Sequence, residues 1–151
     1  MPNKKTHLAA GAIAGLVTGL ATMTLFEEKD RFAHVLACTL SASGSALLPD
    51  LIEPALNPRH RSTAHSLAAA AGIGALARAR HHAHCLDQAA QCERRAATLA
   101  KDSDAWRNEM LNARLWRLAV AAILGSMAGY ASHLVLDGMT PMGLPLLLSG
   151  T

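Results

Sequence analysis

The sequence predicts an all-α protein built into a membrane, and three observations carry this prediction. Two stretches of 19 residues, Leu8–Phe26 and Leu118–Leu136, contain no Asp, Glu, Lys or Arg, which is enough to span a bilayer. β-branched residues rarely alternate with polar ones, so strand signals are nearly absent. Only 17% of the residues are charged and 51% are hydrophobic. At 151 residues the chain fits one membrane-embedded domain, residues 1–151.

Four apolar segments predict an integral membrane four-helix bundle. They are Leu8–Phe26, Ala33–Leu48, Ser66–Ala77 and Leu118–Leu136. The third is the weakest because it has only 12 residues before Arg78, so it needs shelter from its neighbours or snorkelling arginines to span. The basic start MPNKKTH is also typical of a signal peptide. However, EEKDR leads directly into another apolar segment with no small-x-small cleavage site, which favours a retained helix.

The first segment carries glycines at packing spacing. Gly11, Gly15 and Gly19 recur every four residues, which gives one smooth face on a helix. As incidental glycines in a soluble helix, each would cost roughly 1 kcal/mol relative to Ala. We therefore expect this face to pack closely against another helix.

The polar block 78–117 predicts an extramembrane helical hairpin that extends segments three and four. KDSD at 101–104 predicts its turn, Asp104 is the expected N-cap of the second helix, and Trp116 is expected at the membrane interface. RARHHAHC, at 78–85, offers a rival soft-metal site through His81 and Cys85, although such a run is more often a solvated face.

The charge pattern argues against nucleic acid as a partner. The net charge is +3, but the basic residues lack interleaved aromatics and most share their block with acids. The three cysteines predict no disulfide framework. Cys85 and Cys92 are separated by two helical turns, about 10 Å, which is too far for a disulfide.

Polar residues converge when four helices are threaded up and down. His7 begins segment one, Asp50 follows segment two, His65 opens segment three, and His133 and Asp137 close segment four. All five fall at the same end of the bundle. Imidazoles and carboxylates together bind Zn²⁺ or a similar divalent ion, and ionisable groups at membrane depth are functional candidates. Any one of these residues alone would be interpreted as a helix cap, but five together favour a metal site.

Three motifs in the chain resemble those of a known family. KTHLAAG, LLPDLIEPALNPRHRSTAHS and GYASHLVLDGMTPMG are similar to the YdjM-type family of membrane-bound, metal-dependent hydrolases, over the first 70 and about the last 25 residues. That family is more distantly similar to zinc phospholipase C and P1-type nuclease, which are all-helical enzymes that cleave phosphodiesters. Two departures are LIE, where the family often has a second Asp, and HRSTAHS, where it tends to have Gly and Thr. Neither departure removes a ligand implied for the first metal, but both affect the expected binding of a second metal and of the substrate.

The resemblance implies a site with one or two divalent ions, Zn²⁺ first, with Mn²⁺ or Mg²⁺ as alternatives. One ion would be held by Asp50, His65 and His133, and Asp137 would bridge to a second that His7 helps to bind. The metal would activate a water, with Asp50, Glu53 and Asp137 as the catalytic carboxylates. An ordinary helix cap is an equally good interpretation of Glu53.

Arg59, His60 and Arg61 are candidates for contact with a substrate phosphate, because guanidinium matches phosphate bidentately. A loop facing anionic headgroups explains them equally well. The resemblance thus implies hydrolysis of a phosphoester in a lipid or lipid-linked substrate. The alternatives are a non-enzymatic, metal-stabilised membrane protein whose 78–117 hairpin binds a protein partner, and a soluble helical phosphodiesterase.

Basic residues predict the orientation in a bacterial inner membrane. Four of the fourteen Lys and Arg residues lie at the metal-site end and ten at the hairpin end. Because basic residues near spanning segments prefer the cytoplasm, the metal site is expected on the non-cytoplasmic side. Lys4 and Lys5 oppose this expectation, since the first helix often dominates topology.

Overall fold

The structure is a computed structural model that describes residues 3–52, 72, 74 and 77–139. All its regular elements are helical, and no strand occurs within these residues, so the all-α prediction is confirmed. The elements are α1 (Lys4–Thr22), the short 3₁₀ turn η1 (Met23–Leu25), α2 (Glu28–Ser45), α3 (Leu48–Ile52), the π-helical segment η2 (Ala77–His82), α5 (Ala83–Ala96) and α6 (Asp104–Gly138).

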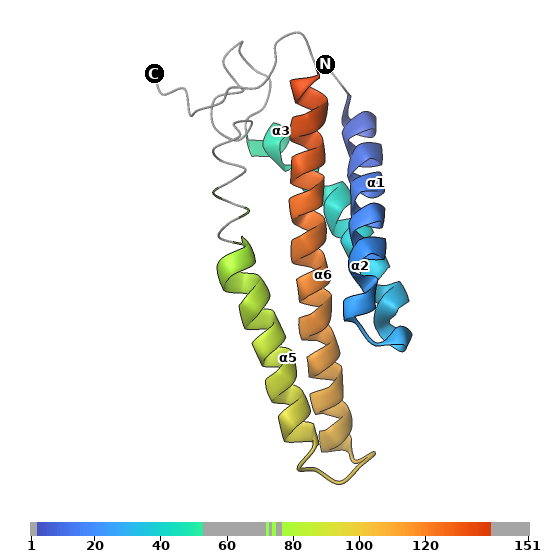
Figure 1. Cartoon of the computed structure of the whole chain (residues 1–151), viewed down its shortest axis with the longest axis vertical. Coiled ribbons are helices and arrows are strands. Elements are labelled where there is room, and N and C mark those ends of the chain that lie inside the picture. Colours follow the sequence, from blue (N-terminus) through green and yellow to red (C-terminus); the bar gives the residue numbers. More distant parts are fainter. Residues whose placement is uncertain (1–2, 53–71, 73, 75–76, 140–151) are drawn as a thin grey trace.

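Three helical stretches are long and apolar enough to cross a membrane (Figure 1). They are Lys4–Leu25, Glu28–Ile52 and Asp104–Gly138. They correspond to the predicted segments one, two and four. The predicted third segment, Ser66–Ala77, lies almost entirely outside the described residues, so a four-helix bundle stays a prediction.

The helix starts follow local capping chemistry. The Asn3 side chain accepts a hydrogen bond from the Thr6 backbone N–H at 3.0 Å and caps α1. At the start of α6 the cap is Ser103, whose hydroxyl accepts from the Trp106 backbone N–H at 3.2 Å. The prediction of Asp104 as N-cap was therefore wrong by one residue. Asp104 is the first helical residue, where its negative charge interacts favourably with the positive end of the helix dipole.

The predicted glycine face of α1 packs directly on α2. Gly11, Gly15 and Gly19 are all buried. A Cβ on Gly15 would lie only 2.6 Å from the Cys38 carbonyl oxygen, and one on Gly11 would lie 2.7 Å from the Ala42 carbonyl oxygen. Only glycine allows the two backbones to approach this closely, so the expectation of close helix packing is confirmed.

A second glycine pair on α6 packs on the neighbouring face of α2. A Cβ on Gly125 would meet the Cys38 carbonyl oxygen at 2.3 Å, and one on Gly129 would meet the Ala42 carbonyl oxygen at 2.0 Å. Ser45 adds a cross-helix bond, because its hydroxyl donates to the Ser126 carbonyl oxygen at 2.8 Å. As a result α2 is in contact with α1 and α6 along most of its length.

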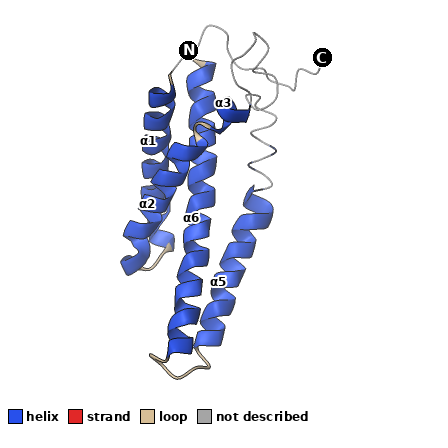
Figure 2. Ribbon diagram, turned by 180° about the vertical axis from the view of Figure 1, so that it is seen from behind, coloured by secondary structure: helices blue, strands red, loops and turns tan. Residues whose placement is uncertain are grey.

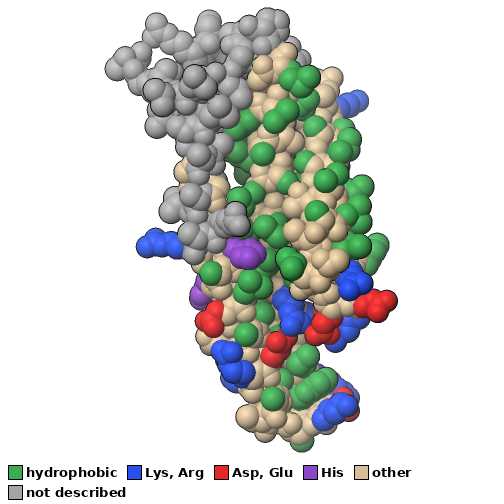
Figure 3. All heavy atoms as spheres, in the orientation of Figure 1, with side chains coloured by type: hydrophobic (Ala, Val, Ile, Leu, Met, Phe, Trp, Pro, Cys, Tyr) green, Lys and Arg blue, Asp and Glu red, His purple; other side chains and the backbone are tan. Residues whose placement is uncertain are grey.

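The first turns of α6 extend beyond α1 and α2, and this end of α6 packs against α5 (Figure 2). Arg95 of α5 and Glu109 of α6 form an ion pair at 3.0 Å, and Arg117 hydrogen-bonds to Glu93. Charged side chains gather on this end of the molecule, while hydrophobic ones cover the visible part of α1 and the second half of α6 (Figure 3). This division is what a bilayer around the apolar half requires.

All three cysteines are free, in agreement with the absence of a predicted disulfide. Cys85 belongs to a small apolar cluster with Phe26 and Val120, where α5, α6 and the connection between α1 and α2 meet. The Cys38 thiol donates to the Ala121 carbonyl oxygen at 3.2 Å and joins α2 to α6.

Candidate metal centre

Four of the five residues predicted to converge do lie at one end of the packed helices. His7 is near the start of α1, Asp50 is in α3, and His133 and Asp137 are in the last two turns of α6, all at the end where α3 lies (Figure 1). The two histidines and Asp137 are at most 1% exposed. The Asp50 side chain is 28% exposed. The fifth residue, His65, lies outside the described residues.

The orientation of His133 is set by a backbone group. Its Nδ1 lies 2.7 Å from the Ala46 carbonyl oxygen, just after the end of α2. A carbonyl can only accept, so Nδ1 carries a proton and donates it. In the neutral ring this leaves the lone pair on Nε2, the usual arrangement of a metal-binding histidine. Nε2 lies 3.5 Å from Asp137 Oδ2 and 3.7 Å from Asp50 Oδ1.

His7 completes the cluster from α1. Its ring stacks on the His133 ring with a centroid distance of 3.9 Å and an interplanar angle of 19°. His7 Nε2 lies 3.8 Å from Asp137 Oδ1, while His133 Nε2 faces the other oxygen. Asp137 therefore presents one carboxylate oxygen to each imidazole and connects α1 with the end of α6.

The spacing of these groups fits a divalent ion. One nitrogen each from His7 and His133 and one oxygen from Asp50 all lie within 4.8 Å of one another. Zn²⁺ takes nitrogen and oxygen ligands at 2.0–2.2 Å in tetrahedral geometry, which sets ligand atoms about 3.4 Å apart. The Nε2-to-carboxylate distances of 3.5–3.8 Å are close to that value. This buried His/Asp/His group could hold a metal ion, and its donor types suit zinc.

The other predicted site residues are not placed. Glu53, Arg59, His60 and Arg61 lie outside the described residues, so their roles stay predictions. In the part of the chain that is described, His7, Asp50 and His133 form the only group of three or more His, Cys, Asp or Glu ligand atoms with metal-binding spacing. The rival pair, His81 and Cys85, belongs to no such group among the described residues, and Cys85 is buried in the apolar cluster with Phe26 and Val120.

Two contributors to the site were missed in the sequence. The Ala46 carbonyl has no sequence signal, because any residue at that position supplies one. Gly129 does have a signal: Gly125 and Gly129 show the same four-residue spacing as the glycines of α1. That spacing predicts the close approach of α6 to α2, which brings His133 within reach of the Ala46 carbonyl.

Comparison with known proteins supports the family resemblance that the three motifs indicated. A family model described as YdjM inner membrane protein matches residues 1–148. The match also covers the polar helices between the motifs, whereas the motif resemblance extends over only the two ends of the chain. Searches of curated proteins and of solved structures found no match.

Proposed function

The chain belongs to the YdjM inner membrane protein family, and from that premise we propose that it is a membrane-bound, metal-dependent hydrolase of a phosphoester in a lipid or lipid-linked substrate. The observation that carries the proposal is the buried group formed by His7, Asp50 and His133 at the end of the apolar helices. Burying several ionisable groups there costs free energy unless they are paired with an opposite charge or bind an ion.

In this proposal each residue has a distinct task. His7, Asp50 and His133 hold the cation, and the Ala46 carbonyl fixes the His133 ring. Asp137 keeps both imidazoles in place through its two oxygens. The cation, Zn²⁺ by its donor set, would supply Lewis-acid polarisation and a water of lowered pKa. Asp50 is the most exposed of the four, so it lies on the side from which a substrate can approach.

The remaining roles come from the resemblance. His65 would complete the ligand set, a second ion is expected beside Asp137, and Glu53 is a further carboxylate for proton transfer. Arg59, His60 and Arg61 would contact the substrate phosphate. The position of the cluster at the end of membrane-spanning helices favours a lipid over a soluble substrate. By the basic-residue count, this end faces away from the cytoplasm.

The length of α6 supports a second candidate function. At 35 residues it exceeds the roughly 20 residues that span a bilayer, and its surplus packs against α5. This pair of helices would then be a partner-binding arm, and the metal would serve only to hold the helix ends together.

Metal analysis of purified protein tests the metal site. His7→Gln and His133→Gln should each lower bound zinc sharply, because loss of one ligand breaks a shared site. His81→Gln, on the polar helices, is the matched control and should retain the full content. If the control loses its zinc and the His133 variant keeps it, the ion has been placed at the wrong end.

Turnover is tested separately with zinc-loaded protein and a chromogenic phosphoester. Asp50→Asn should abolish hydrolysis. A fully loaded protein that stays inactive over a broad panel of phospholipids would refute the hydrolase and favour the scaffold.

A further inference from the structure

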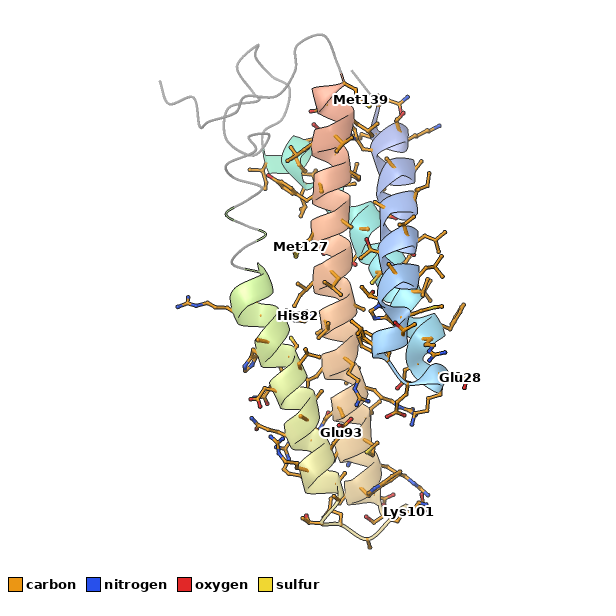
Figure 4. The ribbon with its side chains drawn as sticks, in the orientation of Figure 1. Glu28, His82, Glu93, Lys101, Met127 and Met139 are labelled. Atoms are coloured by element: carbon orange, nitrogen blue, oxygen red, sulfur yellow. The ribbon has the colours of Figure 1, made fainter. Side chains whose placement is uncertain are left out.

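A second polar site lies at the opposite end of the spanning helices. A cavity of about 220 Å³ opens between the first turns of α2 and the middle of α6. Its wall is mostly apolar and includes Phe26, Leu111 and Leu115, but Asp30, His34 and Arg114 also line it. In Figure 4, Glu28 marks the start of α2 near this cavity, and Met139 marks the far end of α6, beside the metal centre.

His34 presents a hydrogen-bond acceptor here. The Thr22 hydroxyl donates to the Thr18 carbonyl oxygen at 2.7 Å, so its oxygen accepts from His34 Nε2 at 2.7 Å. The Cys38 thiol cannot supply a proton to His34, because it donates to the Ala121 carbonyl. Nε2 therefore carries the proton, and Nδ1 has a lone pair. His34 is 1% exposed, and its Nδ1 has no hydrogen-bond partner in the described part of the chain.

Asp30 presents a second acceptor on the same wall. Its Oδ1 pairs with Arg114 Nε at 3.6 Å. Its Oδ2 is buried and makes no hydrogen bond to any described residue. Buried acceptors of this kind are costly unless a donor satisfies them. Two buried acceptors without a hydrogen-bond donor among the described residues therefore belong to side chains that line the cavity.

The charges around the cavity restrict the ligand further. Arg117 is held by Glu93 and, at 3.5 Å, by Glu27, so it has little capacity for a ligand. Arg114 is half-exposed, and its single described ion pair, with Asp30, leaves guanidinium donors that can bind a phosphate. A ligand with an amine, a phosphate and an apolar part would satisfy all three features.

We propose that this cavity binds an aminophospholipid. The primary ammonium donates to Asp30 Oδ2 and His34 Nδ1, the phosphate contacts Arg114, and the apolar wall receives the start of the acyl chains. The site lies where the apolar helices meet the charged end of the molecule, which is the headgroup level of a bilayer. It is separate from the metal centre and does not depend on the hydrolase proposal.

Native mass spectrometry of the full chain, stripped of lipid in detergent, tests this directly. The protein is offered phosphatidylethanolamine, its N-methyl and N,N-dimethyl derivatives, phosphatidylcholine and phosphatidylglycerol with identical acyl chains. Retention should fall once fewer than two N–H donors remain for the two acceptors, that is with the N,N-dimethyl lipid, and reach about tenfold between the primary amine and the choline lipid. Equal retention of all five lipids would mean an unspecific lipid annulus and would overturn the proposal.

Variants locate the site. His34→Phe removes both ring nitrogens at similar size while the Thr22 hydroxyl keeps its bond to the Thr18 carbonyl, and Asp30→Asn removes the carboxylate charge at nearly constant shape. Both should reduce phosphatidylethanolamine retention to the phosphatidylcholine level. Arg107→Gln, an exposed change on α6 outside the cavity, should leave retention unchanged. A full preference in both cavity variants refutes the assignment. If a variant fails to fold, the methylation series on the wild-type chain still decides.

Discussion

Replacing Gly129 by Ala should destabilise the protein and weaken its metal site together. The new Cβ would lie 2.0 Å from the Ala42 carbonyl oxygen and 2.4 Å from the Ser45 hydroxyl oxygen. Ordinary contact begins at 3.4 Å, so α6 and α2 must separate by about 1.4 Å at this point. Backbone cannot rotate away as a flexible side chain can, so the helices themselves must shift.

The expected cost is about 1–3 kcal/mol for overpacking, partly offset by the roughly 1 kcal/mol that Ala gains over Gly in a helix. The net cost is then up to about 2 kcal/mol, which for a chain of this size corresponds to a decrease of up to roughly 8 °C in the unfolding temperature. His133 lies one turn after Gly129, so its 2.7 Å contact with the Ala46 carbonyl would lengthen to about 4 Å, beyond hydrogen-bond range. Zinc affinity should fall with it.

Gly44→Ala is the matched control, because a Cβ on Gly44 meets nothing within 4 Å although Gly44 is on the same helix as Ala42. It should unfold at or slightly above the wild-type temperature and keep its zinc. Thermal unfolding in detergent and zinc titration measure both effects. If Gly129→Ala unfolds like Gly44→Ala and binds zinc normally, α6 and α2 do not pack through this glycine.

Three further outcomes are expected. The protein should stay with the membrane after alkaline carbonate washing and need detergent for extraction, and recovery without detergent would favour a soluble phosphodiesterase. The basic-residue count predicts that the arm formed by α5 and α6 lies in the cytoplasm, so an impermeant thiol reagent should label Asn108→Cys only after cell lysis. Burial raises the pKa of the Cys85 and Cys92 thiols, so these two native cysteines should give little background labelling. Labelling in intact cells would reverse the orientation. The hydrogen bond from Arg95 lowers the pKa of the Glu109 carboxyl, so this exposed pair contributes a little stability above the ordinary carboxyl pKa that is lost as pH falls through the lowered one. Glu109→Gln should remove that acid dependence from a thermal melt; an unchanged dependence would mean that the pair does not hold α5 to α6.

The sequence was sufficient for features that depend on chain direction and residue type. Helices of bilayer length must alternate in direction, so the positions of His7, Asp50 and His133 along the chain already placed them at one end. The glycine face of α1 could also be predicted, because glycines spaced four residues apart in a membrane helix favour close packing against another helix.

Features that depend on tertiary contacts could not be predicted from the sequence. The tautomer of His133 follows from the Ala46 backbone carbonyl, which carries no residue signature. Asp30 belongs to the EEKDR sequence, which is typical of a solvated helix start, and only packing against α6 shows that Asp30 and His34 line a cavity. The N-cap of α6 was missed by one position because Ser103 and Asp104 are both good caps, and only the backbone geometry separates them.

The two polar sites have a common structural origin. Glycines let α1 and α6 contact α2 backbone to backbone, so the middle of the spanning region has little space for side chains or water. Larger polar groups can be accommodated only toward the ends, where α3 joins at one end and α6 diverges toward α5 at the other. The candidate metal cluster and the cavity proposed to bind lipid occupy these two ends. Because α6 supplies residues to both, a change in its packing on α2 should be felt at each of them, and Gly129→Ala offers a way to measure that in one variant.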